Sequence, residues 1–134
     1  MMLKEAGYEV AEYRLLPDEQ TQIETVLKEL SDEKEMDLIL TTGGTGFSQR
    51  DCTPEATMNG ATRNAPGIAS LAITPRAMLS RGVSVIRNQT LIINLPGSPK
   101  AVKENLEYIL PTLSHGLEIL KGVTGECGIS LKET

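Results

Sequence analysis

Residues 41–57 read TTGGTGFSQRDCTPEAT. This stretch follows a short apolar run at residues 38–40, which is typical of a buried parallel strand. Three glycines within four positions let the backbone turn tightly and approach a ligand closely: Gly43, Gly44 and Gly46. Backbone N–H groups in such a loop form a concave anion site, and the hydroxyls of Thr42 and Thr45 add donors. The stretch therefore predicts a strand followed by a phosphate-binding glycine loop.

Charged residues and a helix start follow the loop. Arg50 can bind phosphate, and Asp51 can hold a metal ion. Thr53 is expected as the N-cap of a helix, with Pro54 at the first helical position and Glu55 in the first turn. A phosphate cradle beside a carboxylate indicates nucleotide or phosphorylated-cofactor chemistry.

Composition limits the class of protein without identifying it. A chain of 134 residues is expected to form one domain with its own core. Its net charge of −5 argues against nucleic acid or an anionic membrane as the main partner. No apolar run approaches the length of a membrane span, and the two cysteines, Cys52 and Cys127, lack metal-type spacing. We therefore expect a reduced, cytoplasmic protein.

The remaining pattern alternates helices and strands. We expect a helix end at 1–6, a strand at 9–16, a helix at 19–35, a short helix at 53–63, strands at 82–86 and 90–95 joined as a hairpin, and a helix at 99–121 that Pro111 kinks or divides. This order predicts an α/β fold, a three-layer α/β/α sandwich with a mostly parallel sheet. Residues 1–121 would form the domain, and residues 122–134 a loose tail.

Three segments with unusual polar or glycine residues follow predicted strands. Asp18 follows the strand at 9–16, and the glycine loop follows the strand at 38–41. The third segment follows the strand at 90–95: Pro96, Gly97 and Ser98. Because ligands of such folds bind beyond the carboxyl ends of the strands, we expect these loops to form one site.

Each of these features also has a purely structural interpretation. A glycine loop between a strand and a helix is often only a tight turn. Asp18 and Asp51 could cap the helices that follow them, and Ser98 before Pro99 is explained fully as an N-cap. The pair at residues 80–81 could be ordinary surface residues.

The stretch at 41–57 resembles the signature of the molybdopterin adenylyltransferase family, whose domain bacterial molybdenum-cofactor enzymes share with gephyrin. Further matches follow in the family's order at residues 16–19, 65–67, 74–81 and 91–98. Together they cover residues 3–122. A single GGTG would be a weak signal, whereas five motifs in the right order are a strong one.

The resemblance implies adenylyl transfer from ATP to the terminal phosphate of molybdopterin, with Mg²⁺ and release of pyrophosphate. It makes Asp51 and Asp18 the catalytic carboxylates and the metal ligands. The nucleotide side of the site would comprise Thr42, Gly43, Gly44, Thr45, Gly46 and Arg50. The pterin side would comprise Ser80, Arg81, Pro96, Gly97 and Ser98. A homotrimer and a downstream molybdenum insertase as partner are also implied.

Two departures from the family leave alternatives open. Family members begin with a further strand, in the sheet interior, and a loop before the helix that here starts at Met1. They also have a longer segment where residues 69–73 stand. Either the printed sequence lacks residues that the protein has, or the chain is this short, in which case we expect it to be inactive. Two other functions compete with adenylyl transfer. The chain could be a molybdopterin-binding or scaffold module without turnover, or a paralogue that acts on another nucleotide or pterin.

Overall fold

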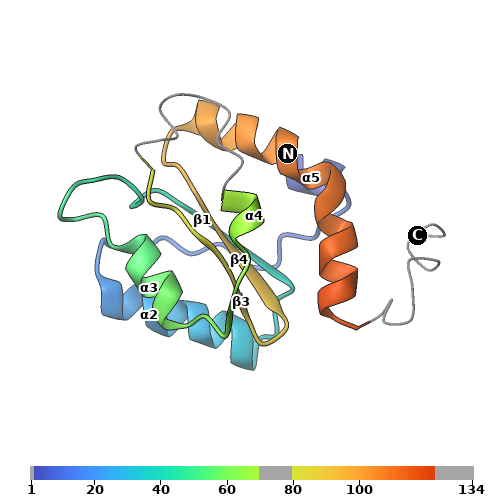
Figure 1. The fold of residues 1–134 in the computed structure, drawn as a ribbon, viewed down its shortest axis with the longest axis horizontal. Helices are drawn as coiled ribbons and strands as arrows, with labels where there is room; N and C mark the ends of the chain where they lie inside the picture. Colours follow the sequence, from blue (N-terminus) through green and yellow to red (C-terminus); the bar gives the residue numbers. More distant parts are fainter. Residues whose placement is uncertain (1, 70–79, 123–134) are drawn as a thin grey trace.

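A four-stranded sheet organises residues 2–69 and 80–122, which the computed structural model describes (Figure 1). The strand order is β1-β4-β3-β2. The strands are β1 (Leu38–Thr42), β2 (Arg63–Asn64), β3 (Ser84–Arg87) and β4 (Thr90–Leu95). The helices are α1 (Met2–Glu5), α2 (Gln20–Lys28), the π-helical continuation η1 (Glu29–Glu33), α3 (Thr53–Asn59), α4 (Pro66–Ala69) and α5 (Pro99–Leu120).

Helices cover both faces of this sheet, which confirms the three-layer α/β/α arrangement (Figure 1). Alternate residues of β4 point to opposite faces, because side chains alternate along a strand. Ile92 belongs to the core that α2 and α3 close, whereas Leu91 and Ile93 belong to the core that α5 closes. Burial of β4 on both faces explains why three successive residues of the strand, Leu91, Ile92 and Ile93, are apolar.

The sheet is mixed, so the expectation of a mostly parallel sheet is wrong for the described residues. Among the four described strands, only β1 and β4 pair in parallel, with Thr42 opposite Leu95. The pairs β3–β4 and β2–β3 are antiparallel. The hairpin between β3 and β4 was expected, and Asn88 in its turn adopts the left-handed conformation, with φ +55°. The short β2 then extends the sheet in the same antiparallel manner.

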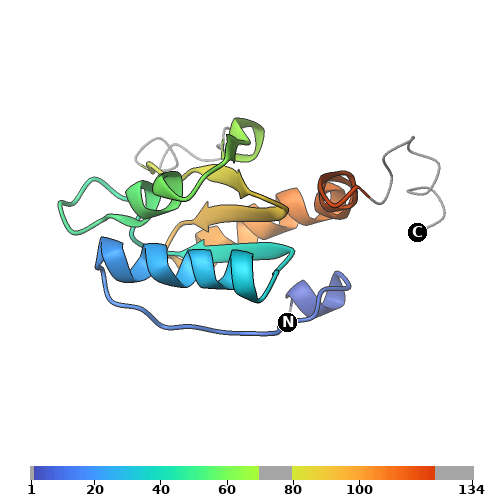
Figure 2. The same cartoon turned by 90° about the horizontal axis from the view of Figure 1, so that it is seen from below.

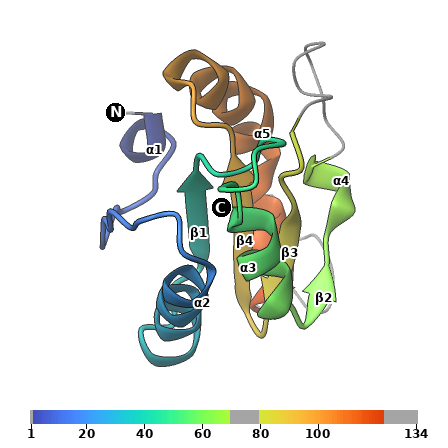
Figure 3. The same ribbon diagram turned by 90° about the vertical axis from the view of Figure 1, so that its left-hand side faces the viewer.

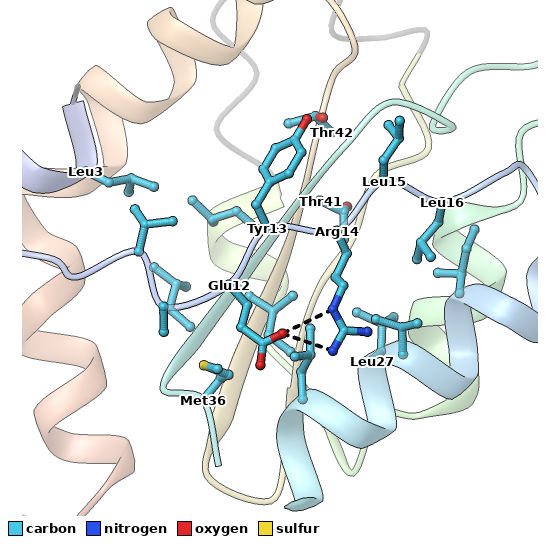
Figure 4. A pocket seen from close by; sticks show the side chains of 18 of the residues that line it. Leu3, Glu12, Tyr13, Arg14, Leu15, Leu16, Leu27, Met36, Thr41 and Thr42 are labelled. Atoms are coloured by element: carbon cyan, nitrogen blue, oxygen red, sulfur yellow. Dashed lines mark hydrogen bonds and ion pairs between the residues drawn. The ribbon is translucent and has the colours of Figure 1, made fainter. Parts of the chain in front are cut away.

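The predicted strand at residues 9–16 is also wrong. The segment is extended and lies alongside β1, outside the sheet (Figures 2 and 3). A hollow of about 650 Å³ separates the two, and α2 forms another of its walls (Figure 4). No backbone hydrogen bond joins residues 9–16 to β1 in the described chain. The segment that carries Val10, Tyr13 and Leu15 therefore pairs with no strand there, and these three side chains are exposed.

The helices agree well with the sequence. Helix α1 lies within the helix end predicted at 1–6 and is followed by Gly7, with φ +95°. Helix α2 and its continuation η1 lie within the helix predicted at 19–35. The helix predicted at 53–63 ends earlier, at Asn59, where Gly60 follows it. Helix α5 remains continuous and bends along its length (Figure 1), and Pro111 inside it removes one backbone hydrogen bond. The predicted tail at 122–134 and the short segment at 69–73 lie almost entirely outside the described residues.

Candidate functional site

The glycine loop begins where β1 ends and touches the loop that follows β4. Gly43 donates its N–H to the carbonyl of Leu95, at 3.0 Å. A Cβ atom on Gly97 would lie 3.4 Å from the Cα atom of Gly43. Because β1 and β4 are parallel neighbours, their carboxyl ends meet, and the two predicted ligand loops lie in contact.

Positive backbone angles shape this loop. Gly43 has φ +87° and Gly44 has φ +71°, a region that side chains of L-residues rarely occupy. The carbonyl of Gly44 accepts the N–H of Thr53, at 3.2 Å, so the loop also contacts the start of α3. Cys52, rather than the expected Thr53, occupies the N-cap position of α3, and no side chain caps that helix. Pro54 lies at its start as expected.

Asp51 lies against the far end of the glycine loop. A Cβ atom on Gly46 would come within 2.8 Å of Asp51 Oδ2, so any other residue at position 46 would force the Asp51 carboxylate to move. Asp51 Oδ2 also accepts the N–H of Ser48, at 3.0 Å, which closes the intervening turn. The turn itself is exposed, including Phe47, with 67% of its surface accessible. The structure thus brings the predicted carboxylate and the predicted glycine loop together.

Arg81 connects several parts of this loop. Its Nε atom donates to the carbonyl of Gly46 at 2.8 Å, and its Nη2 atom donates to the carbonyl of Asp51 at 2.6 Å. Its Nη1 atom forms an ion pair with Glu55 on α3, and its backbone N–H donates to the carbonyl of Thr45 at 2.7 Å. This pairing raises the pKa of Arg81 and lowers the pKa of the Glu55 carboxyl. Sequence reasoning placed Glu55 in the first turn of α3 and missed its partnership with Arg81.

Arg50 and Asp18 meet at the outer rim of the site. Arg50 Nη2 lies 3.4 Å from Asp18 Oδ2, which joins residues 32 positions apart in sequence. Both side chains are exposed, Arg50 by 83% and Asp18 by 46%, so the pair is open to solvent and weak. Each of these side chains could therefore exchange its partner for a ligand at small cost.

The thiol of Cys52 is half-buried at the N-cap position of α3. Burial, together with the negative charges of Asp18, Glu55 and Asp51, raises the pKa of this thiol. That Asp18 and Asp51 share one site stays a prediction.

Two predicted serines already have partners within the chain. Ser98 Oγ accepts the N–H of Ala101, at 3.4 Å, as the expected N-cap of α5. Ser80 Oγ accepts the N–H of Gly82, at 3.1 Å. Both serines are exposed. Their hydroxyl groups can still donate hydrogen bonds to an anion.

A polar cluster beneath the site was not expected from the sequence. Asn94 on β4 is buried, and its Nδ2 atom donates to Thr41 Oγ1 and to Thr57 Oγ1, both at 3.0 Å. Its Oδ1 atom accepts the N–H of Val83, at 3.1 Å. An asparagine inside the apolar run of β4 was the available signal, because a buried amide requires partners. The cluster joins β1, α3 and β4 below the glycine loop.

The carboxylates present fit Mg²⁺ better than a metal held wholly by protein. Residues 2–69 and 80–122 contain no group of three or more His, Cys, Asp or Glu side chains that could hold an ion. Mg²⁺ usually takes one or two carboxylates and completes its shell with water and substrate phosphates. Asp51 and Asp18 are the candidate carboxylates for such a site. No helix in the same residues is long and apolar enough to cross a membrane.

Fold and site together define the class: a three-layer α/β domain with a glycine loop at the carboxyl end of a parallel strand and Asp51 beside that loop. The chain belongs to the family described as "Probable molybdopterin binding domain", which matches residues 1–115. It is 51% identical over 118 residues to the molybdopterin adenylyltransferase of Haemophilus influenzae, covering 84% of this chain. It is 55% identical over 104 residues to that of Escherichia coli, covering 73% of this chain.

A solved structure agrees with the fold. The crystal structure of the molybdopterin biosynthesis enzyme MoaB from Thermus thermophilus superposes with a TM-score of 0.83 at 48% identity. The match covers 90% of this chain and 82% of that one. The chain spans 59% and 53% of the length of the two adenylyltransferases. The family and the fold predicted from the sequence are thus confirmed.

Proposed function

We propose that the chain acts in molybdenum cofactor biosynthesis as a molybdopterin adenylyltransferase. The reaction joins the terminal phosphate of molybdopterin to the α-phosphorus of ATP and releases pyrophosphate. The observation that carries the proposal is the contact between Gly43 and Gly97, because the two loops that we propose bind the ligands touch there, and Asp51 lies against the far end of the glycine loop. The names of the adenylyltransferases that resemble this chain support the same activity.

Such a reaction needs alignment and charge neutralisation more than a covalent intermediate. Two polyanions must meet in line, so backbone N–H groups and cations near the phosphates lower the barrier. The N–H groups of the glycine loop would hold the nucleotide or its pyrophosphate. Arg50, whose pair with Asp18 is exposed, would turn toward a phosphate. Ser98, at the start of α5, would meet the pterin phosphate, together with Ser80, Pro96 and Gly97.

Mg²⁺ is part of the proposal. It would be held by Asp51, with Asp18 as second carboxylate or as the group that orients the ATP phosphates. When bound, the ion would neutralise phosphate charge and fix the geometry of the leaving pyrophosphate. The Oδ1 atoms of these carboxylates are the ligands on offer, because the Oδ2 atom of each already has a partner.

Pyrophosphate release tests the proposal directly. We expect release from ATP to require both Mg²⁺ and molybdopterin. Release without molybdopterin would point to another nucleotide substrate, the paralogue alternative. Binding of molybdopterin without release of pyrophosphate would make the chain a binding or scaffold module. The edge of β1 beside the glycine loop, which no other strand of the described residues covers, favours this second function.

A homotrimer and a molybdenum insertase as downstream partner are further proposals that rest on family membership. Sedimentation equilibrium measures the first of these. A trimer requires a mass three times the 14.5 kDa of the chain, and a monomer mass contradicts it.

A further inference from the structure

The Arg81 side chain ties together both ends of the exposed turn that carries Arg50. Its Nε atom bonds the carbonyl of Gly46 and its Nη2 atom bonds the carbonyl of Asp51, so one guanidinium spans the base of the turn at residues 46–51. Hydrogen bonds within that turn are local, such as that from the N–H of Ser48 to Asp51. The turn reaches the rest of the described chain mainly through Arg81.

The same guanidinium has no nitrogen left without a protein acceptor. Nη1 pairs with Glu55, and Nη2 reaches the second oxygen of that carboxylate at 3.4 Å. Four of its five N–H donors are thereby used, so only one N–H of Nη1 remains for a phosphate, and a two-bond phosphate contact would displace Glu55 or a backbone carbonyl. The carboxylate that Arg50 contacts, by contrast, is exposed and weakly held. The two arginines that the sequence assigned to ligand binding therefore differ in what they can do.

We propose that Arg81 is a positioning residue, which holds the Gly46–Asp51 turn and thereby orients the Asp51 carboxylate. Glu55 in turn holds the guanidinium in place. This inference rests on the proposed function and assigns Arg81 a different task from the phosphate contact expected from the sequence. Arginine suits the task because its planar fork can bond several acceptors at fixed angles. Lysine carries the charge but lacks the fork.

The chain contains a matched control at the opposite end of β3. Arg87 donates to the carbonyl of Gly60 at 2.9 Å and makes two bonds to Asp32, at 3.1 Å and 2.6 Å. It therefore also joins a backbone carbonyl to a carboxylate, but away from the glycine loop. Arg87→Met removes the same chemistry without touching the proposed site.

The test measures the turn and the ligand separately. Amide hydrogen exchange over residues 46–51, molybdopterin binding and pyrophosphate release are compared in wild type, Arg81→Met and Arg87→Met. For Arg81→Met we expect exchange in the turn at least about tenfold faster. Its kcat should fall roughly 10- to 100-fold, while the Kd for molybdopterin changes less than about threefold. Arg87→Met should leave all three unchanged.

Two results would overturn the inference. One is unchanged exchange in the turn of Arg81→Met. The other is a Kd for molybdopterin more than about tenfold weaker with unchanged exchange, because Arg81 would then be a phosphate ligand. If wild type releases no pyrophosphate, the proposed function fails, while the exchange and binding measurements still judge the role of Arg81.

A second pair of variants keeps the test valid if Arg81→Met does not fold. Glu55→Gln retains an acceptor for Arg81 but removes its charge, so we expect a smaller rise in exchange. Arg81→Lys retains the charge without the planar fork, so its kcat should lie nearer to the kcat of Arg81→Met than to that of wild type. Wild-type kcat and exchange in Arg81→Lys would contradict a positioning role.

Discussion

Gly44 and Thr53 are in a contact that only glycine permits. A Cβ atom on Gly44 would lie closer to Thr53 Oγ1 than van der Waals contact allows, and the backbone of Gly44 has φ +71°. The carbonyl of Gly44 also accepts the N–H of Thr53, at 3.2 Å. The glycine loop therefore packs directly against the first residue of α3. A side chain at position 44 would push the start of α3 away.

Gly44→Ala should destabilise the fold by about 1–3 kcal/mol, because alanine adopts a left-handed backbone only with strain and would also push Thr53 away. Urea unfolding measures the loss. Gly116→Ala is the control: it lies inside α5 with open space around its Cα, and we expect stabilisation by about 0.5–1 kcal/mol. Equal effects of the two substitutions would contradict the close contact at Gly44.

Asp51→Asn should lower the rate of pyrophosphate release by about 100-fold or more while molybdopterin still binds. The substitution keeps the shape beside Gly46 but removes the charge that would hold Mg²⁺, and such charge stabilisation is worth several kcal/mol. Asp37→Asn is the matched control, since Asp37 pairs with Lys121 at the surface, at 2.9 Å. Turnover close to wild type in Asp51→Asn would show that the metal lies elsewhere.

Local patterns predicted the local structure well. Ser98 before Pro99 predicted the start of α5, and in the structure Ser98 is the N-cap of that helix. The glycines after residues 38–40 predicted the loop, and β1 ends where the loop begins. Caps, turns and strand ends depend on neighbours a few residues away, so a single sequence carries them.

Pairing between distant segments was harder to predict. The alternation at residues 9–16 describes a strand with two faces, yet a strand forms only where a neighbour satisfies its backbone groups, and none of the described strands does so here. Arg81 and Glu55 are 26 residues apart, and nothing in either local pattern joins them. The candidate residues of the site were proposed from the sequence, whereas the hydrogen bonds that orient them came only from the fold.

Asn94→Ala should destabilise the protein by about 1–3 kcal/mol, because it leaves Thr57 and the N–H of Val83 without their buried partner. Urea unfolding again gives the free energy. Asn59→Ala is the control: Asn59 bonds Glu24 at the surface, at 2.8 Å, and its loss should stay within about 0.5 kcal/mol. A cost for Asn94→Ala as small as that of the control would mean that water replaces the amide.

Acid should remove the stabilisation that the Arg81–Glu55 pair provides. The hydrogen bond from Arg81 lowers the pKa of the Glu55 carboxyl in the folded chain below its value of 4.5 in the unfolded chain. Because the pKa of Glu55 is lower in the folded chain than in the unfolded chain, its carboxylate stabilises the fold fully at pH values above the unfolded-state pKa. This stabilisation is lost as the pH falls through the pKa of the folded chain. The Tm difference between wild type and Glu55→Gln should therefore be constant from pH 7 to about 5 and shrink below about 4.5.

The same comparison in an Arg81→Met background isolates the pair. With the guanidinium gone, Glu55 loses the partner that lowers its pKa, so Glu55→Gln should produce a Tm difference with little dependence on pH in this range. Thermal melts at about pH 7, 5, 4 and 3 for the four proteins of this cycle provide the measurement. A pH dependence that persists without Arg81 would assign the low pKa of Glu55 to its place in the first turn of α3, where the helix dipole also favours a negative charge.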